Sequence, residues 1–138
     1  MIKYLKNLTS SCPPQIEEVP VRTVNVIKKG SVCQYDDEGY VDKINTDDYA
    51  TKFLILDDKN ENDGKDKVRA IRLLPGMVIE APIYEDPDVP MPVFVGNSAS
   101  FYSDDSNNYV KINVGSGSLS ICSLLNSNKT AICVIKNA

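Results

Sequence analysis

The residues of this chain that could do chemistry are carboxylates, thiols, lysines and tyrosines, because its 138 residues include no histidine. Without histidine, Ser-His-Asp and Cys-His nucleophile pairs and histidine-bound zinc are excluded. The usual general base near neutral pH is excluded as well. The composition therefore removes most of the common hydrolytic and group-transfer mechanisms.

Two pairs of carboxylates stand close enough in sequence to suggest acid–base or metal chemistry, Asp86 with Asp88 and Asp104 with Asp105. Each pair lies among turn-forming residues, where Asp is favoured because its side chain bonds to nearby backbone. No other polar group converges on either pair in the sequence. We therefore expect no catalytic residues and a protein that is not an enzyme.

The charged run at residues 57–67 (DDKNENDGKDK) suggests a calcium loop. When Gly64 is placed at the sixth position of an EF-hand, Lys59 falls at the first position and Ala70 at the twelfth. Both of these ligand positions are wrong for an EF-hand. We expect a charged hairpin connection and no cofactor, and a looser calcium site within the loop stays open.

The four cysteines show no metal-binding or redox spacing, since no CxxC pair occurs. Cys33, Cys122 and Cys133 lie in apolar runs (SVCQY, SICSLL and AICVI). A free cysteine in such a run behaves as a small core residue, and we expect all three to be buried. Whether Cys12 is exposed and reactive stays open.

The charge of the chain argues against binding to nucleic acid, because the net charge is −4 and the pI is about 4.8. Residues 1–35 carry five basic and two acidic side chains, whereas residues 36–88 carry seven basic and fifteen acidic ones. This asymmetry could steer one copy onto another, or onto a complementary surface. No apolar run is long enough to span a bilayer, so we expect no membrane partner.

The elements that must position these residues are short strands. Apolar and β-branched runs alternate with turn residues such as Lys29-Gly30, Pro75-Gly76 and Gly96-Asn97, and long helical periodicity is absent. The pattern predicts an all-β fold, a small barrel or sandwich of short antiparallel strands. We expect strands within 19–27, 31–35, 39–43, 52–56, 67–73, 77–83, 92–95, 98–102, 109–114, 119–124 and 130–135, and at most a helical turn within 45–52.

Four segments are expected along the chain. Residues 1–19 are predicted to form an extended N-terminal arm, because Pro13 and Pro14 prevent a helix. Residues 20–84 and 93–138 are predicted to form two β units, which could share one core. The proline-rich stretch at residues 85–92 is predicted to connect them.

Residues 20–83 contain a recurring strand-and-turn pattern: Lys29-Gly30-Ser31-Val32, then Gly39-Tyr40-Val41, then residues 68–73 followed by the closing residues 75–82. In this pattern the segment resembles a small tailed-bacteriophage capsid decoration, or cement, protein. The resemblance implies a non-enzymatic structural protein that binds the outside of a viral capsid shell and stabilises it. The implied partner is the major capsid protein. The implied location is the virion exterior, after synthesis in the host cytoplasm, and the implied assembly is a homo-oligomer, with a trimer favoured, or contact between neighbouring copies through the arm.

The arm and the closing strand are the contact surfaces that we expect. The predicted contact residues are Leu5, Leu8, Pro13, Pro14, Val19, Met77, Ile79 and Pro82.

Two alternatives stay open. A carbohydrate- or receptor-binding β module of a fibre or adhesin would use Tyr102 and Tyr109 beside nearby Asp and Asn side chains, namely Asp104, Asp105, Asn107 and Asn108. A histidine-free trimeric nucleotide hydrolase of the dUTPase kind is a remote alternative. It rests on residues 39–49 (GYVDKINTDDY), and the other motifs of that family are missing.

Overall fold

The structure of the chain is a computed structural model, which describes residues 1–44, 50–88, 92–104, 107–112 and 117–136. Its regular elements are strands, and none of the described residues lies in a helix, which confirms the predicted all-β class. The helical turn expected within 45–52 falls mostly outside the described residues. Within the described ranges, no helix is long and apolar enough to cross a membrane.

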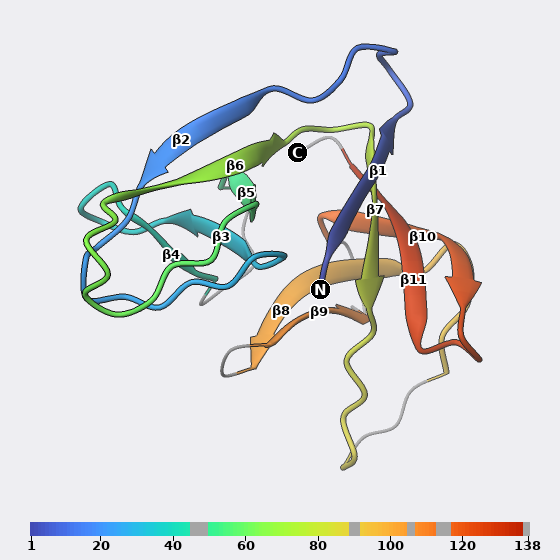
Figure 1. The fold of residues 1–138 in the computed structure, drawn as a ribbon. Coiled ribbons are helices and arrows are strands. Elements are labelled where there is room, and N and C mark those ends of the chain that lie inside the picture. Colours follow the sequence, from blue (N-terminus) through green and yellow to red (C-terminus); the bar gives the residue numbers. More distant parts are fainter. Residues whose placement is uncertain (45–49, 89–91, 105–106, 113–116, 137–138) are drawn as a thin grey trace.

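The strands of the described residues form two antiparallel sheets (Figure 1), which are not closed into a barrel and are compatible with a sandwich. The six-stranded sheet has the order β1 (Lys3–Asn7), β7 (Met77–Pro82), β11 (Thr130–Ile135), β10 (Leu119–Leu125), β8 (Ser98–Asp104) and β9 (Asn107–Ile112). The five-stranded sheet has the order β2 (Ile16–Pro20), β6 (Lys67–Leu73), β5 (Lys52–Ile55), β3 (Val32–Tyr35) and β4 (Val41–Lys43).

One segment, residues 3–20, supplies an edge strand to each sheet, and we call it the N-terminal edge segment. β1 pairs antiparallel with β7, and β2 pairs antiparallel with β6. Because β6 runs directly into β7, these four strands form a bent two-stranded ribbon that belongs to both sheets (Figure 1). The bend is held between the strands, where the Leu8 amide donates to the Gly76 carbonyl at 2.9 Å.

The N-terminal residues are extended, as predicted, and they form edge strands of the two sheets. Ile2 and Val19 are buried, and both strands of the segment bond to the chain's own sheets. Pro13 and Pro14 do prevent regular structure, but they lie in the connection between β1 and β2 and interrupt neither strand. The sequence did not reveal the pairing because the partners, β6 and β7, lie far along the chain.

The chain passes from one sheet to the other before residues 85–92, where the connection between the two β units was expected. β7 lies in the same sheet as β8 to β11, so the chain changes sheets between Leu73 and Met77. The larger core contains residues of both sheets, including Ile79 and Ile121 from one and Leu54 and Ile71 from the other.

A second core covers the other face of the five-stranded sheet. It consists of Val19, Val21, Ile27, Cys33, Val41, Phe53, Ile55, Val68 and Ala70.

The predicted strands at 67–73 and 130–135 have the observed bounds, and most of the others differ by only a few residues. Two expectations are wrong. Residues 92–95 form no strand, because Phe94 to Asn97 make a tight turn in which the Asn97 side chain accepts the Phe94 amide at 2.8 Å. The run at 19–27 leaves its strand after Pro20 and turns at residues 23–24.

Candidate functional site

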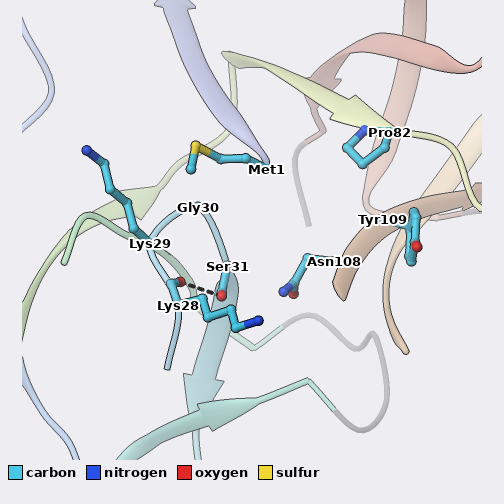
Figure 2. Close-up of a pocket in the computed structure, with 8 residues that line it drawn as sticks. All are labelled: Met1, Lys28, Lys29, Gly30, Ser31, Pro82, Asn108 and Tyr109. Carbon is cyan, nitrogen blue, oxygen red and sulfur yellow. Dashed lines mark hydrogen bonds between the residues drawn. The ribbon is translucent and has the colours of Figure 1, made fainter. Parts of the chain in front are cut away.

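The pocket that lies where the two sheets meet is the first candidate site, and we call it the junction pocket (Figure 2). Its volume is about 310 Å³. It is lined by Met1, Lys28, Lys29, Gly30, Ser31, Pro82, Asn108 and Tyr109. These residues come from the N-terminus, the turn before β3, the end of β7 and the start of β9.

The polar backbone groups of the junction pocket are largely engaged in hydrogen bonds within the chain. The Lys29 amide donates to Asp58 Oδ1 at 2.9 Å, and the Gly30 amide donates to the Ile55 carbonyl at 2.9 Å. The Val32 amide donates to Asn108 Oδ1 at 3.3 Å, which ties β3 to β9. A phosphate cradle needs unpaired backbone amides, so these bonds argue against one at this turn.

Side-chain chemistry is equally restricted in the junction pocket. The Ser31 hydroxyl donates to the Lys28 carbonyl, and Figure 2 shows the Lys29 amine directed away from Asn108 and Tyr109. None of the described lining residues is a carboxylate or a thiol. The described groups of the pocket that could still take part in chemistry are the Lys28 and Lys29 amines and the Tyr109 hydroxyl.

A group of three tyrosines and a lysine adjoins the pocket and forms the second candidate site, the tyrosine cluster. The Tyr84 ring lies 4.4 Å from the Tyr102 ring and 5.7 Å from the Tyr109 ring, centroid to centroid. Tyr102 and Tyr109 are directly opposite on β8 and β9. Lys111 Nζ lies 5.1 Å from the Tyr102 ring centroid and 5.6 Å from that of Tyr84.

Tyr84 is held in the tyrosine cluster by a backbone hydrogen bond and by a side-chain hydrogen bond. The Tyr84 amide donates to the Val110 carbonyl at 2.8 Å, which fixes Tyr84 beside β9. Hydrogen bonding to Tyr102, assisted by desolvation, raises the pKa of Tyr84, so the Tyr84 hydroxyl stays protonated at physiological pH. The sequence pointed to Tyr102 and Tyr109, but it missed Tyr84 because Tyr84 lies outside the hairpin.

The described members of the two carboxylate pairs are Asp86, Asp88 and Asp104. Asp86 Oδ1 accepts the Asp88 amide at 2.9 Å, which is the local turn bonding expected of this residue. Asp104 is exposed at the end of β8, and Asp105 and the Asn107 side chain lie outside the described residues. Among the residues that the structure describes, no group of three or more acidic or cysteine side chains is placed to hold a metal.

The suspected calcium loop contains a buried lysine. The Lys59 side chain is fully buried, and its Nζ donates to the carbonyls of Thr23, Asn25 and Asn60 at 2.8, 3.1 and 2.9 Å. Asp63 Oδ1 lies 3.5 Å from the same nitrogen. The ammonium group thus occupies the place that a cation would take among these oxygens, and it joins the 57–66 loop to residues 23–25.

Several carboxylates take part in surface ion pairs that are structural in character. Arg22 holds the pKa of Asp36 below its usual value through a side-chain hydrogen bond at 2.8 Å. Arg69 lowers the pKa of Asp57 in the same way, also at 2.8 Å. Both pairs link neighbouring loops or strands, and neither faces the junction pocket.

Two of the three cysteines predicted to be buried are buried. Burial raises the pKa of the Cys33 and Cys133 thiols to about 12, so both remain protonated and unreactive in the folded chain. Cys122 is exposed, which contradicts the prediction. Cys122 follows the buried residues Leu119 and Ile121 in the alternation of β10, so it lies on the outer face, and Cys12 is exposed as well.

The predicted contact residues divide into two groups. Val19, Met77 and Ile79 are no more than 4% exposed and belong to the cores, so they are not available to a partner. The residues that do reach the surface are Leu5, Leu8, Pro13, Pro14 and Pro82, of which Pro14 and Pro82 are half-buried.

Other exposed apolar residues were missed in the sequence. Ile16 is 57% exposed at the start of β2, and Phe94 and Val95 are about 60% exposed at the tight turn before β8. The Gly96 amide donates to the Ile121 carbonyl at 2.8 Å, which fixes this turn against β10. Alternation alone did not identify these residues, because each lies at a strand end or in a turn.

Comparison of the chain with protein-family models, with curated proteins and with solved structures finds no match. The likeness to phage decoration proteins therefore rests on the sequence pattern of residues 20–83.

Proposed function

We propose that the chain is a non-enzymatic structural protein that binds the outside of a viral capsid shell and stabilises it, with the major capsid protein as its partner. The observation that carries the proposal is the contrast between engaged polar groups and exposed apolar ones. The buried lysine, the Asp86 carboxylate and the pocket amide of Lys29 all bond within the chain. Leu8 and Phe94, by contrast, are each more than 60% exposed on segments fixed by backbone hydrogen bonds.

The fold supports attachment through a preorganised surface. A side chain that is already held in place loses less entropy when a partner covers it. The connection between β1 and β2 presents Leu8 and Pro13, and its course is fixed by a paired strand at each end. This connection is therefore the surface that we assign to the shell.

The test is a binding assay with undecorated shells assembled from the major capsid protein of the same genome. Deletion of residues 1–20 is unsuitable, because it removes an edge strand from each sheet. We expect saturable binding by the wild-type protein and a loss of at least tenfold in affinity for Leu8→Asp, about the effect of one lost apolar anchor. Val24→Asp, at a similarly exposed position on the far loop, is the matched control. Absence of binding to these shells, or equal effects of both variants, would contradict the proposal.

The absence of enzymatic activity is part of the same proposal and has its own test. Residues 39–44 of the segment that is similar to a nucleotide-hydrolase motif form a turn and β4, and residues 45–49 lie outside the described residues. We expect no pyrophosphate release from nucleoside triphosphates. Turnover that co-purifies with the protein and responds to substitution of Asp42 would favour the hydrolase.

The tyrosine cluster favours carbohydrate binding as a second candidate function. Aromatic side chains pack on sugar rings, and hydroxyl and amine groups bond to sugar hydroxyls. The cluster presents such groups together on β8 and β9, where Tyr102 and Lys111 are half-buried. A glycan array with no hits, or hits that survive Tyr102→Ala, would count against this candidate.

A further inference from the structure

The two edge strands of the N-terminal edge segment carry charges of opposite sign. β1 has the sequence KYLKN, and its exposed charged side chains are Lys3 and Lys6. β2 has the sequence IEEVP and carries Glu17 and Glu18. The six-stranded sheet therefore has a basic edge at β1, and the five-stranded sheet of the same molecule has an acidic edge at β2.

Part of this charge is used within the chain and part is not. Glu17 is paired with Arg72 at 2.8 Å, and Lys3 Nζ lies 3.8 Å from Glu80 Oε2. Lys6 and Glu18 are exposed and form no ion pair with the residues that the structure describes. These two side chains are therefore the charges that each edge leaves without an ion pair in the described part of the chain.

Both edges also retain main-chain hydrogen-bonding capacity. In the described part of the chain, β1 pairs with β7 alone and β2 with β6 alone. An unpaired edge is a template for another strand, and proteins usually protect it with charge or with a bulge. β1 has such a bulge at Leu5, which shortens the stretch that can pair.

We propose that the β1 edge of one copy docks against the β2 edge of a second copy of this chain. Lysines oppose glutamates in that pairing, whereas a β1–β1 contact would oppose lysines and a β2–β2 contact would oppose glutamates. Charge thus selects one of the three possible edge pairings. Leu5 and Ile16, 44% and 57% exposed, add apolar area at these same two strands.

The pairing can be satisfied in two symmetric ways. In a two-fold dimer each copy gives β1 to its partner and receives the partner's β1 on its own β2. In a head-to-tail ring each copy gives β1 to one neighbour and accepts β1 from another. Neither arrangement depends on a shell, so this inference stands apart from the proposed function.

The test is the mass of the protein in solution, measured by sedimentation and light scattering over a range of concentration and salt. We expect assemblies larger than the 15.2 kDa monomer that weaken as salt rises. Lys6→Glu and Glu18→Lys should each raise the dissociation constant about tenfold, because each replaces an attraction with a repulsion. Lys129→Glu and Glu61→Lys, at exposed positions away from both edges, are the matched controls.

Two rescue experiments sharpen the result. The double variant Lys6→Glu/Glu18→Lys restores complementary edges, and its assembly should return. A mixture of the two single variants should restore a two-fold dimer but not a ring of three, because a three-membered ring would contain one like-charged contact. Recovery in the double variant supports the pairing. A monomeric wild-type protein, assembly that ignores both reversals, or no recovery in the double variant would overturn it.

The shell-binding assay and the mass measurement test the two proposals separately, so either proposal can be refuted while the other stands. Leu8→Asp is expected to reduce shell binding and to leave the mass in solution unchanged, since Leu8 lies beyond the end of β1. Lys6→Glu is expected to change the mass in solution even when no shell is present.

Discussion

Replacement of Lys59 by Met is the sharpest test of how the loops of the five-stranded sheet are held. The ammonium group is fully buried and donates to three carbonyls from two chain segments. Methionine has nearly the same length and fills most of the same space, so the substitution removes the donor with little change in packing. The three carbonyls and Asp63 then lose their common partner.

The size of the effect follows from those contacts. Lys59→Met leaves three carbonyls without their donor, and Asp63, whose side chain is 21% exposed, without its ion pair. Each buried acceptor left without a donor costs about 1–3 kcal/mol, so the three carbonyls together give a loss of about 3 kcal/mol or more. A domain of this kind has a free energy of unfolding of about 5–15 kcal/mol, so the loss is a large fraction of the total.

The assay is equilibrium unfolding in urea, with tyrosine fluorescence and far-ultraviolet circular dichroism as probes. With a slope of about 1–3 kcal/mol per molar urea, the midpoint for Lys59→Met should fall by at least ~1 M. Lys65→Met is the matched control in the same loop, because Lys65 is exposed and its Nζ donates to one carbonyl, that of Asp58, at 2.8 Å. We expect the control to cost less than about 1 kcal/mol.

A loss below about 1 kcal/mol for Lys59→Met would refute the reasoning, since it would mean that the three carbonyls find water or other donors at no cost. Equal losses for both lysine variants would refute it as well. Added calcium should leave the wild-type unfolding midpoint unchanged, because the Lys59 ammonium group already occupies the position among the three carbonyls that a calcium ion would need.

Three further predictions test the structure. Thiol labelling with a chromogenic disulfide should modify the two exposed cysteines at once and the two buried ones only after denaturation; four rapid thiols would contradict the cores. Because Asp36 and Asp57 have lowered pKa values, the unfolded chain takes up protons before the folded chain does, and stability should decline as the pH falls below about 4 in urea titrations at fixed pH. A free energy of unfolding that stays constant below about pH 4 would argue against both ion pairs. Gly76→Ala should destabilise the chain by about 1–3 kcal/mol, and by more than Gly39→Ala, because both have a positive φ but only at Gly76 would the new Cβ lie 2.8 Å from Thr9 Cγ2.

The strands were predictable from the sequence because apolar and polar residues alternate locally along them. Val68, Ala70 and Leu73 of β6 are buried, and Arg69 and Arg72 between them are exposed. Gly30, Gly39, Gly76 and Gly96 all have positive φ at the turns where the sequence placed them. Period and turn chemistry depend on neighbours in the chain, so one sequence suffices to find them.

The positions of Lys59 and Cys122 were not predictable in this way. Lys59 lies in a run of charged residues, which is typical of a solvated loop, and it is buried because Thr23 and Asn25 fold over it. Cys122 lies in an apolar run, which is typical of a core strand, but the alternation of β10 places it on the face opposite to the buried Leu119 and Ile121. The contacts that bury Lys59 come from a segment distant in the sequence, whereas the apolar neighbours of Cys122 did not show which face of its strand lies against the core.

The N-terminal edge segment shows the same limit on a larger scale, and it decides how the two sheets behave. β1 pairs with β7 and β2 pairs with β6, and β6 leads directly into β7. If the N-terminal edge segment separates from these two strands, both sheets lose an edge strand. The larger core also draws Leu54 and Ile71 from one sheet and Ile79 and Ile121 from the other. Loss of either sheet would expose the shared core of the other. The two sheets should therefore unfold in one transition, with calorimetric and van't Hoff enthalpies that agree, and two resolved transitions would show that the ribbon does not couple them.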